Sequence, residues 1–228
     1  MKKVLLLMVS LLVGWAAELP AGMVSWRVTS GGTFLSKRVK SVKELRYKKV
    51  VRQKLDYSCG SAALATVLKY YYGRDISEEE IVREILRFGD KEKISKRGFS
   101  MLDLKLFADR TGFRAEGYKV KLEYLPKIPI PTIVLLDIKG YKHFVVLKGV
   151  REDKVYIADP ALGNRVMSLE DFARSWNGIL LAVFGKRPEG APPFEVASIL
   201  EAPREGLGHL RDLGPRAPFL SHPFEIKR

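Results

Sequence analysis

The pattern of hydrophobic and polar positions divides the chain into a helical first half and a strand-rich second half. Small and apolar residues surround residues 58–72 on almost every side, which predicts a buried helix that ends near Gly73. A capping-box pattern opens a second predicted helix over residues 77–86, and residues 100–112 have the spacing of a third. We therefore expect the helices to precede the first strand.

Short runs rich in β-branched and aromatic residues follow the predicted helices. They predict strands at residues 113–120, 132–138, 143–150, 155–158 and 179–184. One more helix is expected at residues 168–176, where a serine stands at the capping position. Helices first and strands afterwards are typical of an α+β domain with two packed halves, which we place at residues 41–186.

The first 17 residues have the pattern of a secretory signal peptide. Lys2 and Lys3 precede an apolar run, Val4–Val13, and the small residues that follow place the best cleavage point after Ala16. The run is shorter than the ~20 residues that a membrane-spanning helix needs, which favours a cleaved signal over an uncleaved anchor. No cysteine directly follows the run, which excludes a lipid-anchored lipoprotein. We therefore expect export and a periplasmic protein.

Charge and proline content mark the segments on either side of the predicted domain. The net charge is +14, and the stretch from Arg27 to Lys54 has ten basic residues and one acid, Glu44. We interpret residues 18–40 as a linker and solvated basic arm, with peripheral contact with a membrane surface as the alternative. No aromatic-interleaved basic motif accompanies this charge, so we expect no nucleic-acid partner.

Seven of the twelve prolines follow residue 186, which predicts a poorly ordered tail at residues 187–228.

The candidate chemistry begins with the only cysteine of the chain, Cys59. Exported proteins normally use cysteines in disulfides, and a single cysteine cannot form one within the chain, which favours a catalytic thiol. Cys59 stands at the start of the first predicted helix, where unpaired N–H groups and the helix dipole stabilise a thiolate. We expect Ser58 or Asp56 to cap this helix. Gln53, six residues upstream, and the backbone N–H of Cys59 are candidate donors to the oxyanion of a tetrahedral intermediate.

A histidine and an aspartate supply the other candidate catalytic groups. His143 is the only histidine of the predicted domain, and it would take the thiol proton and later protonate the leaving amine. Asp159 follows sixteen residues later, so in a hairpin centred on Arg151 the two side chains lie directly opposite on one face. The more turn-like pair Glu152-Asp153 shifts this register and requires a bulge to correct it. Asp159 would then orient the imidazole as the third member of a triad.

Each of these residues also has a structural explanation. A lone cysteine is commonly a small buried hydrophobic residue, a histidine at a strand start is commonly a hydrogen-bonded core residue, and Asp159-Pro160 forms an ordinary turn. Their occurrence together, in the order Gln, Cys, His, Asp, favours catalysis. One cysteine and one histidine cannot fill the four positions of a structural zinc site, so we expect neither a metal nor an organic cofactor.

Three blocks of the sequence resemble the C39 peptidases. They are QKLDYSCGSAALATVLKYYY at residues 53–72, GYKHFVVL at residues 140–147 and VYIADP at residues 155–160. The resemblance extends from about Ser41 to Lys186 and implies a papain-like fold, with a helical half and an antiparallel sheet half. Members of this family typically cleave leader peptides after a double glycine during the export of bacteriocins and related peptides.

The resemblance also implies a role for each candidate residue. It makes Cys59 the nucleophile, His143 the base, Asp159 the orienting residue and Gln53 the oxyanion donor. The best-known members are domains of ATP-driven transporters, whereas this chain is similar to the stand-alone exported branch, which includes the peptidase of Fap-type functional-amyloid export systems. We therefore expect a co-exported protein or peptide as the substrate and outer-membrane export machinery as a partner.

Other functions share these features and define the alternatives to an exported cysteine endopeptidase. A C39-like module can bind a secretion substrate or a pore without cutting it, and a thiol acyltransferase or amidase uses the same triad with another acceptor. The pair Gly31-Gly32 also offers a self-processing site that would release Thr33, although a flexible linker accounts for the two glycines equally well.

Overall fold

The computed structural model describes residues 22–27 and 34–189. It divides the chain into two units, Met1–Leu45 and Arg46–Arg228. The predicted signal peptide, the pair Gly31-Gly32 and nearly all of the predicted tail lie outside the described residues. No helix of the described ranges is both long enough and apolar enough to cross a membrane.

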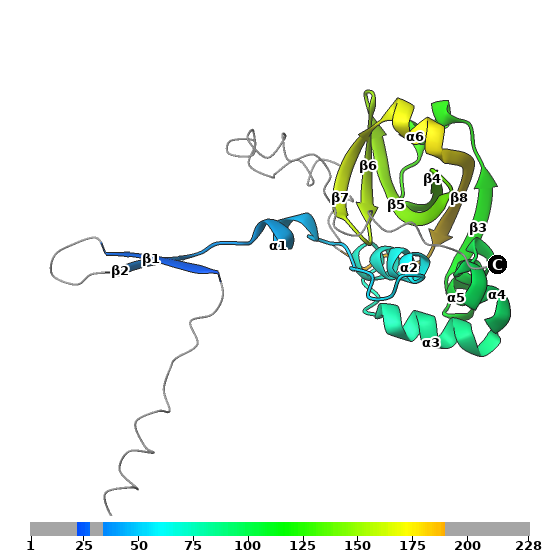
Figure 1. Cartoon of the computed structure of the whole chain (residues 1–228), viewed down its shortest axis with the longest axis horizontal. Coiled ribbons are helices and arrows are strands. Elements are labelled where there is room, and N and C mark those ends of the chain that lie inside the picture. The colour runs from blue at the N-terminus through cyan, green and yellow to red at the C-terminus, as the bar shows by residue number, and fades with distance from the viewer. Residues whose placement is uncertain (1–21, 28–33, 190–228) are drawn as a thin grey trace, which may run out of the picture. The chain divides into compact units, whose positions relative to one another are not determined.

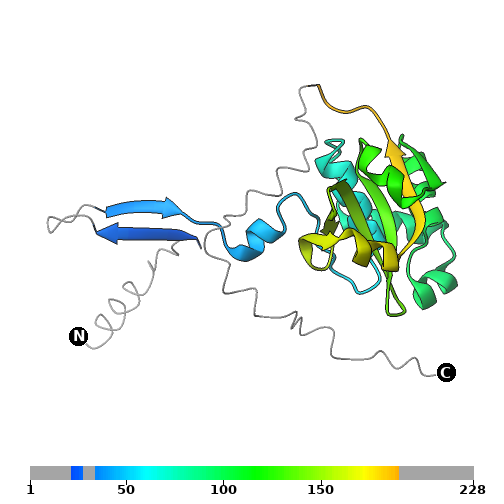
Figure 2. The same cartoon turned by 90° about the horizontal axis from the view of Figure 1, so that it is seen from above.

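The first unit contains regular structure where a linker is expected. Strands β1 (Met23–Arg27) and β2 (Phe34–Arg38) form an antiparallel hairpin, whose opposed directions are clear in Figure 2. A short helix, α1 (Val42–Arg46), follows and has no buried residue. Two strands thus lie within residues 18–40, and the positions described between residues 36 and 46 are exposed. The role of residues 18–40 as a linker and basic arm stays a prediction.

The helical half of the second unit confirms the three helices expected before the first strand. Its helices are α2 (Cys59–Tyr70), α3 (Glu78–Phe88), α4 (Lys91–Arg97) and α5 (Met101–Arg110). Capping boxes begin α3, at Ser77, and α5, at Ser100, because each serine hydroxyl and a carboxylate three residues later satisfy otherwise unpaired N–H groups. Helix α4 was not expected from the sequence, because only one of its seven residues is apolar and no helical period is visible.

The strand-rich half forms one six-stranded antiparallel sheet in the order β3-β8-β4-β5-β6-β7. Its elements are β3 (Arg114–Lys119), β4 (Thr132–Ile138), β5 (Tyr141–Arg151), β6 (Lys154–Asp159), β7 (Gly163–Ser168) and β8 (Trp176–Phe184). A 3-10 helix, η1 (Leu122–Lys127), precedes β4, and α6 (Leu169–Ser175) precedes β8. The edge strand β7 was missed, because its mostly polar residues lack the enrichment that identifies a strand.

Alternate residues of the sheet pack into two separate hydrophobic clusters. Ile133 of β4 faces the cluster that includes Leu64 of α2 and Phe107 of α5, whereas the next residue, Val134, faces the cluster that includes Phe172 of α6. Figure 1 shows α2–α5 gathered on one side of the sheet and α6 on the other. The predicted α+β class, with a helical half and an antiparallel sheet half, is therefore confirmed.

Candidate active site

The lone thiol lies at the first residue of α2. Cys59 is 7% exposed, and it belongs to the cluster between the helices and the sheet. Ser58 occupies the capping position, but its hydroxyl makes no capping hydrogen bond, and no cap from Asp56 is present either. The expected side-chain cap is therefore wrong, because the Ser58 hydroxyl instead contacts Leu55 and the carboxylate of Glu78. The first N–H groups of α2 remain free of side-chain caps beside the thiol.

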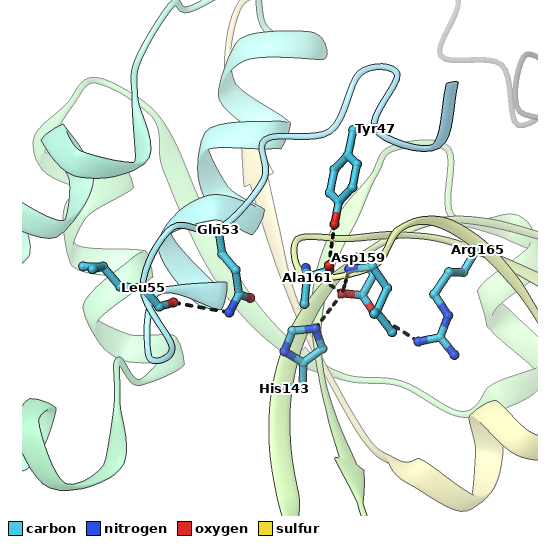
Figure 3. A network of polar contacts seen from close by, with 8 residues as sticks. Tyr47, Gln53, Leu55, His143, Asp159, Ala161 and Arg165 are labelled. Carbon is cyan, nitrogen blue, oxygen red and sulfur yellow. Dashed lines mark hydrogen bonds and ion pairs between the residues drawn. The ribbon is translucent and has the colours of Figure 1, made fainter. Parts of the chain in front are cut away.

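His143 of β5 and Asp159 at the end of β6 meet as an ion pair. The Nε2 atom of His143 lies 2.8 Å from Oδ1 of Asp159, and the two side chains are 5% and 1% exposed (Figure 3). The β5–β6 turn pairs Arg151 with Lys154, so the loop consists of Glu152 and Asp153, where Glu152 has a φ of 54°. This is the turn-like pair that the sequence indicates, and it requires a bulge.

The bulge falls at Lys148. Leu147 pairs with Ile157 and Gly149 with Tyr156, which leaves Lys148 as the extra residue. Beyond the bulge, Val146 pairs with Ala158, and the same register continued places Asp159 opposite position 145. The expectation that His143 and Asp159 lie directly opposite is therefore wrong: they are diagonal neighbours, two residues apart in register. The bulge nevertheless puts both side chains on one face, as the alternation of strand residues requires.

The carboxylate of Asp159 is surrounded by donors. Its Oδ1 atom also accepts the backbone N–H groups of Ala161 at 2.9 Å and Leu162 at 3.1 Å, and its Oδ2 atom accepts Arg165 Nη1 at 3.1 Å. Burial alone would raise the pKa of Asp159, but the hydrogen bond to His143 and these donors outweigh burial and lower it. Asp159 is therefore held as an anion against the imidazole.

The second nitrogen of His143 is free to act on the thiol. Nδ1 is buried and has no hydrogen-bond partner, whereas Nε2 is engaged by Asp159. Burial by itself lowers the pKa of His143, but Asp159 and the neighbouring Cys59 outweigh burial and raise it from 6.5 to about 9. This balance favours a protonated imidazole beside the sulfur, and the arrangement assigns proton exchange with the thiol to Nδ1.

Gln53 lies beside His143 and is fixed by the loop that follows it (Figure 3). Its Nε2 atom donates to the carbonyl oxygen of Leu55 at 3.2 Å, and its backbone N–H donates to Pro160 O at 3.0 Å. An amide nitrogen carries two hydrogens, so the bond to Leu55 leaves one for an oxyanion. The structure thus brings the loop of Gln53, the turn of Asp159 and His143 together as the sequence predicts.

Three contributors to the site were missed from the sequence. Arg165 pairs with the second oxygen of Asp159, the Tyr47 hydroxyl donates to Ala161 O, and the ring of Tyr141 stacks on His143 with centroids 5.9 Å apart. Tyr47 reaches the Asp159 turn from more than one hundred residues upstream, so local spacing gives no sign of it. Arg165 lies on β7, the next strand after Asp159, and was missed because that strand was not predicted. Tyr141 was within reach of prediction, because residues two apart on one strand share a face.

The described part of the chain contains no group of three histidine, cysteine, aspartate or glutamate side chains placed to hold a metal ion. The chemistry that its residues support is nucleophilic attack by a thiol assisted by an imidazole and a carboxylate.

Comparison with known sequences identifies close relatives of the chain. The "Probable functional amyloid protease FapD" of Pseudomonas fluorescens is 44% identical over 166 residues, which cover 73% of this chain and 74% of that protein. The protein of the same name from Pseudomonas aeruginosa PAO1 is 41% identical over 184 residues, covering 81% and 80% of the two chains.

Solved structures share the fold. The peptidase domain of Streptococcus ComA, a bi-functional ABC transporter involved in a quorum-sensing pathway, matches with a TM-score of 0.53 and 26% identity over 61% of this chain and 100% of that one. A double-glycine-motif protease from an AMS/PCAT transporter, in complex with the leader peptide, matches with a TM-score of 0.51 and 33% identity over 60% and 91%.

A family model covers the whole of the second unit's folded core. The model of the peptidase C39 family matches residues 47–187, a range that includes Gln53, Cys59, His143 and Asp159. Together with the relatives named as proteases and the solved peptidase domains of the same architecture, this match is conclusive: the chain belongs to the peptidase C39 family and is a cysteine peptidase with that family's papain-like α+β fold.

Proposed function

We propose that this peptidase is exported to the periplasm and cleaves a co-exported protein of a functional-amyloid secretion system. The observation that carries the chemistry is the buried His143–Asp159 pair, whose imidazole neighbours Cys59, the first residue of α2. The similarity to two proteins named as functional amyloid proteases supports the kind of substrate. The signal-like first 17 residues support export.

The acylation step uses the two nitrogens of His143 for different purposes. Nδ1 takes the thiol proton, and the sulfur of Cys59 attacks the scissile carbonyl carbon, whose π electrons move to its oxygen. The resulting oxyanion receives hydrogen bonds from the Cys59 backbone N–H and the second hydrogen of Gln53 Nε2. When the oxyanion collapses, the C–N bond breaks, the leaving amine takes the proton from Nδ1, and a thioester remains.

The deacylation step returns the enzyme to its starting state. Nδ1 removes a proton from a water molecule, whose oxygen attacks the thioester carbonyl at the same oxyanion site. The C–S bond breaks, the new carboxylic acid leaves, and the proton on the imidazole returns to the sulfur. Asp159 stays ionised throughout and stabilises the imidazolium in its orientation.

The experiment that tests this function compares the exported proteins of cells carrying the wild type or Cys59→Ala by mass spectrometry. Fragments found only with the wild type support the proposal and give the scissile bond. Periplasmic location is tested in the same cells by fractionation, with the mature N-terminus expected after Ala16.

The alternatives predict other results. If the same intact proteins are exported with Cys59→Ala as with the wild type, the chain acts as a binding module. If products carry a newly attached amine when one is supplied, the enzyme is an acyltransferase. A full-length protein that stays in the cytoplasm would overturn the proposed export.

A further inference from the structure

A buried carboxylate outside the proposed triad lies under the loop that carries the nucleophile. Glu78 is the first residue of α3 and is 2% exposed, whereas the next residue, Glu79, has a side chain that is 43% exposed. Burying a carboxylate is costly unless hydrogen bonds compensate it. The hydrogen-bond partners of Glu78 therefore indicate the role of this buried carboxylate.

The partners of Glu78 are the two ends of one short loop. The backbone N–H of Lys54 donates to both of its oxygens, each at 3.0 Å, and the Ser58 hydroxyl donates to Oε1. Lys54 directly follows Gln53, and Ser58 directly precedes Cys59. One carboxylate thus holds both ends of the segment that separates the proposed oxyanion donor from the proposed nucleophile.

A chain of hydrogen bonds continues from the carboxylate to the amide of Gln53. The Leu55 N–H donates to Ser58 Oγ at 3.2 Å, and the Leu55 carbonyl oxygen accepts Gln53 Nε2 at 3.2 Å (Figure 3). The Ser58 hydroxyl has a single proton and lies near both the carboxylate and Leu55 O, at 2.8 Å from the latter. A carboxylate oxygen is a stronger acceptor than a peptide carbonyl oxygen, so the proton goes to Glu78 and the Leu55 oxygen is left for Gln53.

The position of Glu78 is itself fixed. In the capping box of α3, Glu80 N–H donates to Ser77 Oγ at 3.2 Å and Ser77 N–H donates to Glu80 Oε2 at 2.7 Å. The positive end of the helix dipole favours an anion in this first turn. The carboxylate of Glu78 therefore stands on a rigid support.

We propose that Glu78 is a positioning residue of this peptidase: it sets the Lys54–Ser58 loop so that the Gln53 amide and the Cys59 backbone N–H converge on the same oxyanion. It does not touch the substrate. The inference rests on the proposed roles of Cys59 and Gln53.

The test separates oxyanion stabilisation from thiol reactivity in the full chain. p-Nitrophenyl acetate acylates a thiol through a tetrahedral oxyanion, whereas iodoacetamide alkylates it by direct displacement, which needs no oxyanion site. Because Cys59 is the only cysteine, both reagents report on the same sulfur once the rate measured with Cys59→Ala has been subtracted. For Glu78→Gln we expect acylation to fall roughly 10–100-fold, while alkylation changes less than about threefold.

The matched control is Glu79→Gln, on the same helical turn. Glu79 contacts the side chain of Lys54 in an exposed ion pair instead of the loop backbone, so acylation should stay at the wild-type rate. Glu78→Asp keeps the charge with a shorter reach and should recover part of the loss. If Glu78→Gln fails to fold, Ser58→Ala replaces it, with an expected fall in acylation of about tenfold.

A double-mutant cycle shows whether Glu78 acts through Gln53. Gln53→Ala should lower acylation about 10²–10³-fold, and adding Glu78→Gln to it should cost less than Glu78→Gln costs in the wild type, because only the Cys59 N–H is then left to be positioned. Unchanged acylation in Glu78→Gln, full additivity with Gln53→Ala, or an equal fall in alkylation would each overturn the inference. The variant Cys59→Ala distinguishes a failure of this inference from a failure of the proposed function. If Cys59→Ala still cleaves exported proteins, the proposed function itself is wrong.

Discussion

At the scale of single residues, the protonation of His143 links the site to the stability of the fold. The pKa of His143 is raised to about 9 in the folded protein, above the ordinary 6.5. The folded protein therefore binds this proton more tightly than the unfolded chain does, and protonation stabilises the fold. The stabilisation is complete below about pH 6.5 and is lost as the pH rises through about 9. It amounts to roughly 3–4 kcal/mol at most.

We therefore expect wild type to be more stable than His143→Gln by an amount that shrinks between pH 6 and pH 10. Urea unfolding of both proteins across this range measures the difference. In the Cys59→Ala background the pH dependence should weaken, because the sulfur is one of the groups that raise the pKa of His143. A difference that stays constant with pH would contradict the assigned environment of the imidazole.

The residue scale is also where sequence reasoning succeeded most clearly. Cys59 and His143 were recognisable because each is the sole residue of its type in the domain, and Gln53 and Asp159 because their spacing from these two is informative. Glu78 was not recognisable in the same way. The two residues that follow it are also glutamates, and only the fold reveals that Glu78 is the one buried beneath a loop about twenty residues upstream.

At the scale of elements, the start of β7 depends on a glycine. Gly163 has a φ of +81°, and a Cβ atom there would lie 2.7 Å from the backbone oxygen of Arg46 and 2.5 Å from its Cγ atom. We expect Gly163→Ala to destabilise the protein by about 2–4 kcal/mol, because the strained φ and the displaced backbone both add cost. Gly163 pairs with Asp159 in the β6–β7 ladder, so proposed catalysis should fall as well.

Gly112→Ala is the matched control for this prediction. Gly112 has a φ of +89°, but nothing lies within 4 Å of its added Cβ atom, so it should lose only about 1–2 kcal/mol from the backbone conformation. Denaturant unfolding of both variants separates the two contributions. Equal losses of unfolding free energy in the two variants would mean that the segment around Arg46 moves away from the added Cβ atom at no cost.

Elements with a strong pattern were predictable from the sequence, and those without one were not. The capping boxes and apolar spacing of α3 and α5 identify them, and β4 begins with five residues of which four are apolar and three are β-branched. The position of the β5 bulge was not predictable, although the need for one was. Lys148 stands in an otherwise apolar stretch, but only the pairing of both flanks with β6 shows that it is the extra residue.

At the scale of the whole molecule, the peptidase unit contains everything that the proposed chemistry needs. Both hydrophobic clusters and all the site residues lie between Tyr47 and Phe184. We expect a shortened chain of residues 46–189 to fold and to react with p-nitrophenyl acetate at the rate of the full chain. Circular dichroism and acylation kinetics measure both properties.

The same shortened chain tests the basic arm. If it reacts normally with the ester but cleaves the exported substrate more slowly than the full chain does, residues outside it contribute to substrate binding. A shortened chain that fails to fold would contradict the division of the structure into two units at residue 45.

The lone cysteine makes the working molecules of any preparation countable. A thiol reagent can attach to the chain at one position only, so the mass that it adds gives the fraction of molecules whose nucleophile is free and reactive. Dividing an observed rate by this fraction gives the turnover of a single working molecule. The count therefore tells whether a weakly active preparation contains slow enzyme or only a small fraction of active enzyme.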